Sequence, residues 1–205
     1  MADSKTLRDE IERIRRDGGK TNNYAGMDET ISLFYQSSPS LAEVASVLYE
    51  QAMRAKQEST ILTGEARHKK LEEAALFAWC SVGQAQLGDD VIGAGYGAVL
   101  SAEILPGLGR AAEAVITLRQ ALTESLAFAT QVADVDKGRY DNLMMNLYLW
   151  LLYLTTQEGS TTASEVLEWL SAVGGNAVFN RKISADPTLF GRELAAAALY
   201  LARHT

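Results

Sequence analysis

One segment constrains the fold of this chain more than any other, because it is apolar on almost every side. It runs from Arg139 to Gln157, and its middle, residues 143–154, reads LMMNLYLWLLYL. A helix without a polar face must be covered on all sides, so we expect residues 139–157 to form the central helix of a helical domain. The unbroken apolar run, Leu147–Leu154, falls well short of the roughly 20 residues that a membrane-spanning helix needs.

The rest of the chain carries repeated helix signals and few strand signals. Two capping boxes, Ser40–Glu43 and Thr162–Glu165, mark helix starts, and Asp186 followed by Pro187 predicts the start of the last helix. Only residues 177–183 have the character of a strand. Apolar residues at helical spacing predict further helices over residues 5–17, 28–36, 40–57, 67–87, 110–132 and 162–175, with a Gly- and Ala-rich segment at 91–105.

These signals predict an all-α fold of eight to nine helices. Short links imply antiparallel neighbours, arranged as helical hairpins or as an irregular helical bundle. We expect residues 1–24 to be an N-terminal helical arm and residues 25–205 to be a single domain. The apolar stripe of the arm is only three residues wide, so we expect residues 5–17 to add little to the core and to mediate self-association or docking on a partner.

Composition narrows the classes of partner and the compartment. A formal charge of −7 argues against a nucleic-acid-binding surface, which needs clustered Lys and Arg, and no segment predicts membrane insertion. The single cysteine, Cys80, lies beside Trp79 in an apolar helical run, and we expect it to be a buried small hydrophobe. The first residues contain no apolar signal segment, so we expect a cytoplasmic protein.

Motifs for catalysis, metals and cofactors are weak, and we expect none of the three. The two histidines, His68 and His204, have no partner at ligand spacing. Gly93, Gly95 and Ala98 match the positions of a dinucleotide fingerprint, but no strand precedes them and no further strand–helix alternation follows. We expect these glycines to let one helix pack closely against the helix at 67–87.

A polar stripe beside the central helix is the best candidate for ligand or partner contact. Asn142 and Asn146 lie four residues apart on one side of the predicted helix, beside Tyr148 and Tyr153. A buried amide must be hydrogen-bonded, so these side chains could orient a ligand. A satisfied internal network, or an exposed edge of the helix, is the structural alternative.

Two turns between residues 70 and 130 resemble those of tetratricopeptide repeats, which are stacked pairs of helices. The first comprises Gly83, Ala85 and Leu87–Asp89, and the second begins at Leu108–Arg110 and continues through Glu113–Ala114 and Ala121–Leu122. The resemblance implies a scaffold whose concave face binds a peptide or a partner helix. We therefore expect a protein-interaction or adaptor module, and the alternative is a small-molecule binder or enzyme with a pocket beside the 139–157 helix.

Overall fold

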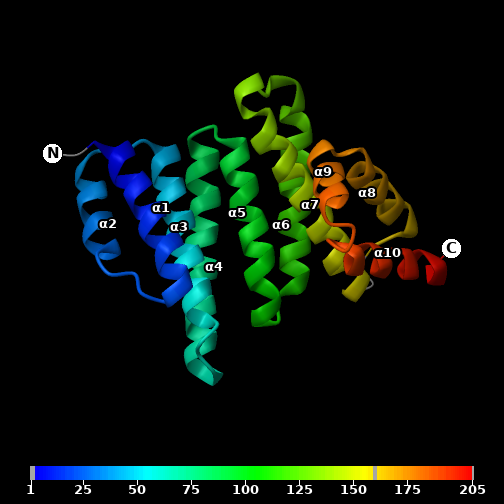
Figure 1. Ribbon diagram of the computed structural model, residues 1–205, viewed down its shortest axis with the longest axis horizontal. Helices are drawn as coiled ribbons and strands as arrows, with labels where there is room; N and C mark the ends of the chain where they lie inside the picture. The colour runs from blue at the N-terminus through cyan, green and yellow to red at the C-terminus, as the bar shows by residue number, and fades with distance from the viewer. Residues whose placement is uncertain (1–2, 159–160, 205) are drawn as a thin grey trace. The chain divides into compact units, whose positions relative to one another are not determined.

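The computed structural model describes residues 3–158 and 161–204, which fold into ten α-helices without a strand (Figure 1). The predicted all-α class with antiparallel neighbouring helices is therefore confirmed, with one helix more than expected. The chain divides into two compact units, residues 1–110 (unit 1) and 111–205 (unit 2). The expected N-terminal arm lies within unit 1.

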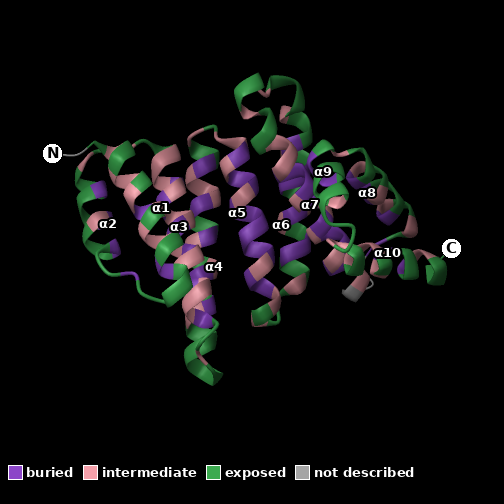
Figure 2. Ribbon diagram, viewed as in Figure 1, coloured by how far each residue is buried: buried purple, intermediate pink, exposed green. Residues whose placement is uncertain are grey.

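Unit 1 contains five helices and a short 3-10 turn. α3 packs against α4, α4 packs against α5, and α1 packs against both α2 and α3. Figure 2 shows that the buried residues of α1 to α4 follow faces of these helices, whereas α5 is buried around whole turns. The elements are α1 (Ser4–Thr21), α2 (Met27–Gln36), α3 (Leu41–Ser59), α4 (Gly64–Leu87), α5 (Val91–Ile104) and η1 (Leu105–Leu108).

Helix α1 belongs to the core of unit 1, which corrects the expectation that it would add little. Ile11 has no exposed surface and packs in a cluster with Met27 and Phe34. In addition, Nε of Arg15 lies 2.5 Å from Oε2 of Glu50 on α3, and both side chains are largely buried. A narrow apolar stripe is enough to hold α1 in the core, because a fully buried isoleucine and an ion pair join α1 to the helices beside it.

The end of α1 also differs from the predicted helix over residues 5–17. The helix continues through Gly18 and Gly19 and ends at Thr21, and its C-cap residue Asn22 adopts a left-handed conformation with φ of 53°. A Cβ atom on Gly18 would lie 2.4 Å from the carbonyl oxygen of Asn23. Gly18 is therefore required because the returning chain passes close to the helix.

Small residues let α3, α4 and α5 pack closely. A Cβ atom on Gly97 would lie 2.8 Å from Cγ2 of Val82, so α5 approaches α4 at a glycine. The glycines of the 91–98 motif lie inside α5 rather than between a strand and a helix. Close packing against α4 occurs at Gly97 and not at Gly93, where a Cβ atom would meet the side chain of Asp90. The buried residues of this contact are Ala52, Ala55, Leu71, Ala74, Ala78, Leu100 and Ile104.

By length and composition, one segment of the described residues could cross a membrane. Val91–Leu108 has a mean hydropathy of 1.4 over 18 residues, and 61% of it is buried within the protein. The core helix of a soluble protein has the same character, so this segment alone does not identify a membrane span.

Unit 2 is built around α7, as expected for the 139–157 segment. α7 packs against α6, α8, α9 and α10, and Leu143, Leu147 and Leu151 are fully buried. The elements are α6 (Ala111–Phe128), η2 (Ala129–Gln131), η3 (Asp134–Asp136), α7 (Lys137–Glu158), α8 (Ala163–Gly175), α9 (Ala177–Ala185) and α10 (Gly191–His204).

Two local predictions in unit 2 are wrong. Residues 177–183 form α9 rather than a strand, because the side chain of Asn176 accepts hydrogen bonds from the backbone N–H groups of Val178 and Phe179 and caps a helix there. The last helix begins at Gly191 and not after Asp186. The carboxylate of Asp186 instead accepts hydrogen bonds from the backbone N–H and the hydroxyl of Thr188, which holds a turn.

Both predicted capping boxes are present, and the first leads to a testable pH dependence. The backbone N–H of Ser40 donates to Oε2 of Glu43 at 2.9 Å. This hydrogen bond lowers the pKa of Glu43 below its ordinary value of 4.5. The stabilisation by the carboxylate is therefore complete above about pH 4.5 and is lost as the pH falls through the lowered folded-state pKa.

We expect Glu43→Gln to cost about 0.5 kcal/mol of unfolding free energy at pH 7, because the variant keeps a hydrogen-bond acceptor but loses the charge at a helix N-terminus. The cost should shrink below about pH 4.5. Urea unfolding at pH 7, 5 and 3.5 measures it, with Glu165→Gln in the second box as the matched variant. A cost that is constant with pH would show that the charge is irrelevant.

Candidate functional site

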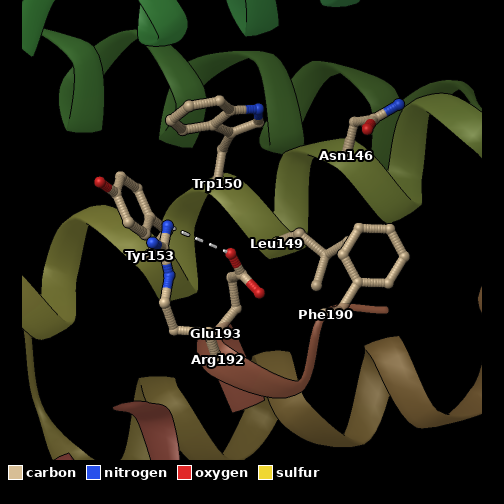
Figure 3. Close-up of a pocket in the computed structure, with 7 residues that line it drawn as sticks. All are labelled: Asn146, Leu149, Trp150, Tyr153, Phe190, Arg192 and Glu193. Carbon is tan, nitrogen blue, oxygen red and sulfur yellow. Dashed lines mark ion pairs between the residues drawn. The ribbon is translucent and has the colours of Figure 1, made fainter. Parts of the chain in front are cut away.

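Unit 2 contains a pocket of about 320 Å³ between α7 and the start of α10 (Figure 3). This volume lies at the small end of the roughly 300–1,000 Å³ typical of ligand pockets. The lining combines aromatic, aliphatic, amide and charged side chains. They are Asn146, Leu149, Trp150, Tyr153, Phe190, Arg192 and Glu193.

The spacing of residues along α7 explains its side of the pocket. Leu149, Trp150 and Tyr153 follow Asn146 by three, four and seven residues, so all four project from one face of the helix. The opposite face carries the fully buried core of unit 2. α7 therefore both fills the core and supplies a pocket wall.

Three aromatic rings give the pocket its apolar character. The rings of Trp150 and Tyr153 are perpendicular, with centroids 5.4 Å apart. The ring of Phe190 is stacked on that of Phe179 from α9 at a centroid distance of 5.7 Å. Aromatic pairs of this kind hold each other in a defined orientation, so the walls are preformed.

Phe190 has an unusual backbone conformation. Its φ of 62° is in the left-handed region, which bulky side chains rarely adopt. Its carbonyl oxygen accepts the first helical hydrogen bond of α10 from the backbone N–H of Leu194. The turn between α9 and α10 thus holds a strained residue at the pocket wall, and strain of this kind concentrates at functional sites.

The charged residues of the pocket are loosely paired. Nη2 of Arg192 lies 3.7 Å from Oε1 of Glu193, which is longer than a good charge-assisted hydrogen bond. The Arg192 side chain is 80% exposed and that of Glu193 only 24%. The Arg192 guanidinium also lies 5.9 Å from the centroid of the Tyr153 ring, within range of a cation–π contact.

The structure brings together two of the four residues in the predicted polar stripe. Asn146 and Tyr153 line the pocket, whereas Asn142 and Tyr148 do not. The amide nitrogen of Asn146 donates to the carbonyl oxygen of Asn142 at 2.9 Å, so that donor is used within the helix. Ligand or partner contact by these residues remains a prediction.

Tyr148 lies on another side of α7 because it follows Asn146 by only two residues, about 200° around the helix. Burial raises the pKa of Tyr148, with smaller effects from Tyr140 and from the carboxylate of Glu168 on α8. Tyr148 therefore faces away from the pocket.

Sequence reasoning missed the pocket residues outside the polar stripe. Trp150 could have been found, because it follows Asn146 by one helical turn. Phe190, Arg192 and Glu193 could not, because nothing in their local sequence predicts that the start of α10 lies against α7.

A second surface was also missed, on α4 of unit 1. Cys80 is exposed, which corrects the expectation that it is a buried small hydrophobe, and Trp79 beside it is 71% exposed. The face that packs inward carries Leu71, Ala74, Ala78, Ser81 and Ala85. The opposite face carries Leu76, Trp79, Cys80, Gly83 and Leu87, which we call the α4 outer stripe.

Among the described residues, no group of three or more His, Cys, Asp or Glu side chains is arranged to hold a metal ion. Nε2 of His68 lies 3.5 Å from a carboxylate oxygen of Glu72 on the surface of α4. His204 stacks on Tyr200 at the end of α10, and its Nδ1 lies 2.8 Å from the Tyr200 carbonyl oxygen.

The described residues form an all-helical protein with an exposed apolar stripe on one unit and an aromatic pocket in the other. No protein family, curated protein or solved structure matches the chain. The functional argument therefore rests on the geometry of these two surfaces.

Proposed function

We propose that unit 1 is a protein-interaction module that binds its partner through the α4 outer stripe. The observation that carries this proposal is the exposure of large apolar side chains in one row, with Trp79 at 71%, Leu87 at 69% and Leu76 at 60%. Contiguous exposed apolar surface of this kind marks interaction sites on soluble proteins. Tryptophan is also among the residues that contribute most to binding when an interface covers them.

The stripe stands on a rigid base, which favours binding. The inner face of α4 packs against α3 and α5, and Oγ of Ser81 donates to the carbonyl oxygen of Ala45 at 2.8 Å. The helix that carries the outer side chains is therefore held in place without a partner. A preformed surface loses less conformational entropy on binding.

The flanks of the stripe indicate the chemistry of the partner. Glu72 is exposed on one end of the same face, and Asp89 is exposed just beyond the other end. We infer that the partner presents an amphipathic helix whose apolar stripe meets Leu76, Trp79 and Leu87 and whose flanks carry Lys or Arg. Charge pairs at the rim would then steer and align the helix.

The resemblance to tetratricopeptide repeats supports this proposal. The α4–α5 hairpin contains the first of the two similar turns, and the implied role of such a scaffold is to bind a peptide or helix. One position departs from the resemblance, because a Cβ atom on Gly83 would meet nothing within 4 Å. Gly83 therefore leaves a gap in the outer stripe that a partner side chain could fill.

A photo-crosslinker attached to Cys80 tests the proposal, because this is the only cysteine and it lies within the stripe. We expect the crosslinker to label a partner protein. The labelled peptide of that partner should be a basic amphipathic helix. The synthetic peptide should bind the unlabelled protein, and Trp79→Ser should weaken that binding by at least about tenfold, since a buried tryptophan anchor contributes 2 kcal/mol or more. Isothermal titration measures the affinity.

Ile116→Ser is the matched control, because Ile116 is an equally exposed apolar residue of unit 2. It should leave the affinity unchanged. Equal binding by the wild type and Trp79→Ser would contradict the proposal, as would a crosslink only to a second copy of this chain. Self-association through residues 5–17 would instead give a concentration-dependent mass that Trp79→Ser does not alter.

A further inference from the structure

We propose that the pocket of unit 2 binds an alkylated ammonium group, such as a trimethylammonium. This inference is independent of the proposed partner of the α4 outer stripe, since every lining residue belongs to α7 or to the segment at the start of α10. Three features of the pocket support it: its aromatic walls, its carboxylate and the cation that the protein itself places there.

The aromatic walls suit a soft, weakly hydrated cation. Trp150, Tyr153 and Phe190 line the space, and their ring faces attract positive charge through the negative potential of the π system. Alkyl groups on the nitrogen also gain from burial against the rings and against Leu149. A hydrophobic cation thus benefits from both properties of the walls.

Glu193 supplies the complementary charge. Its side chain is mostly buried, and Figure 3 shows the carboxylate directed from α10 toward α7, between Tyr153 and Phe190 in that view. Its contact with Arg192 is long, so the pair is not a tight bidentate one. The carboxylate therefore keeps acceptor capacity for a second positive group.

Arg192 places a cation at the edge of the pocket. Its guanidinium lies over the Tyr153 ring while its side chain remains largely exposed to solvent. An incoming ammonium group would take the place of the guanidinium on the ring and beside Glu193, and Arg192 would turn outward. Arg192 is thus an internal competitor for the site.

An anionic ligand fits the pocket less well. Among the described lining residues Arg192 is the only basic one, and the Glu193 carboxylate beside it would repel a carboxylate or phosphate. The two alternatives predict opposite effects of removing Arg192. Loss of the arginine should strengthen the binding of a cation and weaken the binding of an anion.

The test is isothermal titration of the full chain with two probes and one neutral analogue. The probes are choline, a free small molecule, and a short peptide that contains trimethyllysine. The analogue, 3,3-dimethylbutan-1-ol, has the shape of choline without its charge. We expect at least one probe to bind, with an affinity about tenfold or more above that of the analogue, because its charge interacts with several aromatic rings and with the Glu193 carboxylate.

Variants distinguish the pocket from other acidic surface. Arg192→Ala should strengthen the binding of the probe several-fold, whereas Glu193→Gln and Tyr153→Leu should each weaken it about tenfold. Glu168→Gln removes an exposed carboxylate of the same unit outside the pocket and should have no effect. Circular dichroism checks that each variant is folded.

The probe that binds with the higher affinity shows whether the ligand is a free small molecule or a trimethyllysine in a peptide. Either outcome supports the inference. Three results would overturn it: no binding of either probe at millimolar concentrations, equal binding of choline and its neutral analogue, or weaker binding in Arg192→Ala. None of these results bears on the α4 outer stripe.

Discussion

Leu151→Ala is expected to lower the free energy of unfolding by about 2–5 kcal/mol, the range for removing a large aliphatic side chain from a core. Leu151 has no exposed surface, and its helix, α7, is surrounded by the other four helices of unit 2. These helices cannot all shift to fill the space, so most of the cavity should persist. Urea unfolding followed by circular dichroism measures the loss.

Two further substitutions make this experiment specific to the core. Leu151→Met roughly conserves volume and should cost less than about 1.5 kcal/mol. Leu199→Ala removes a half-exposed leucine from α10 and should also cost much less. A loss below about 1 kcal/mol for Leu151→Ala would mean that α7 is not covered on that side.

Arg15→Met is expected to cost about 3 kcal/mol, because it leaves the Glu50 carboxylate buried without its charge partner. Glu50 is only 8% exposed, and Nε of Arg15 is 2.5 Å from its carboxylate. The double variant Arg15→Met/Glu50→Leu should recover most of the loss, since it removes the unpaired charge as well. A full double-mutant cycle measures the coupling.

The cost of Arg15→Met should also depend on pH. Burial raises the pKa of Glu50 above its ordinary value of 4.5, although Arg15 opposes this effect. Without Arg15 the protonated form is favoured further in the folded state. The stability of the variant relative to the wild type should therefore rise as the pH falls through the folded-state pKa of Glu50. A cost that does not change between pH 7 and 4 would show that the carboxylate is not the cause.

Helices with strong end signals could be predicted from the sequence. The two capping boxes gave the starts of α3 and α8, and the all-round apolar pattern gave α7. α9 was missed because Val178, Phe179 and Ile183 favour strands locally, while the Asn176 cap is a weaker signal in sequence. The end of α1 was misplaced because a close chain crossing, and not a helix stop, requires Gly18.

The side of the candidate pocket that α7 supplies could be predicted from the sequence, and the side at the start of α10 could not. Asn146 and Tyr153 share a helical face, and helical spacing alone brings them together. Phe190 reaches the wall only through a left-handed backbone conformation, which the sequence before Gly191 does not signal. Likewise, the exposure of Trp79 could not be predicted, because α4 has two apolar faces and periodicity does not say which one packs inward.

The two apolar faces of α4 give the helix two possible rotations about its own axis while the chain folds. Either face of the helix could cover apolar neighbours during collapse, and the outer stripe, with Trp79 and two leucines, is the bulkier of the two. The inward face carries Ala74, Ala78 and Ala85, which have no exposed surface and allow close helix contact. Since interiors are close-packed, side-chain volume rather than apolarity selects the rotation of α4 about its own axis. A large residue at Ala78 would therefore favour the inverted rotation, with Trp79 buried.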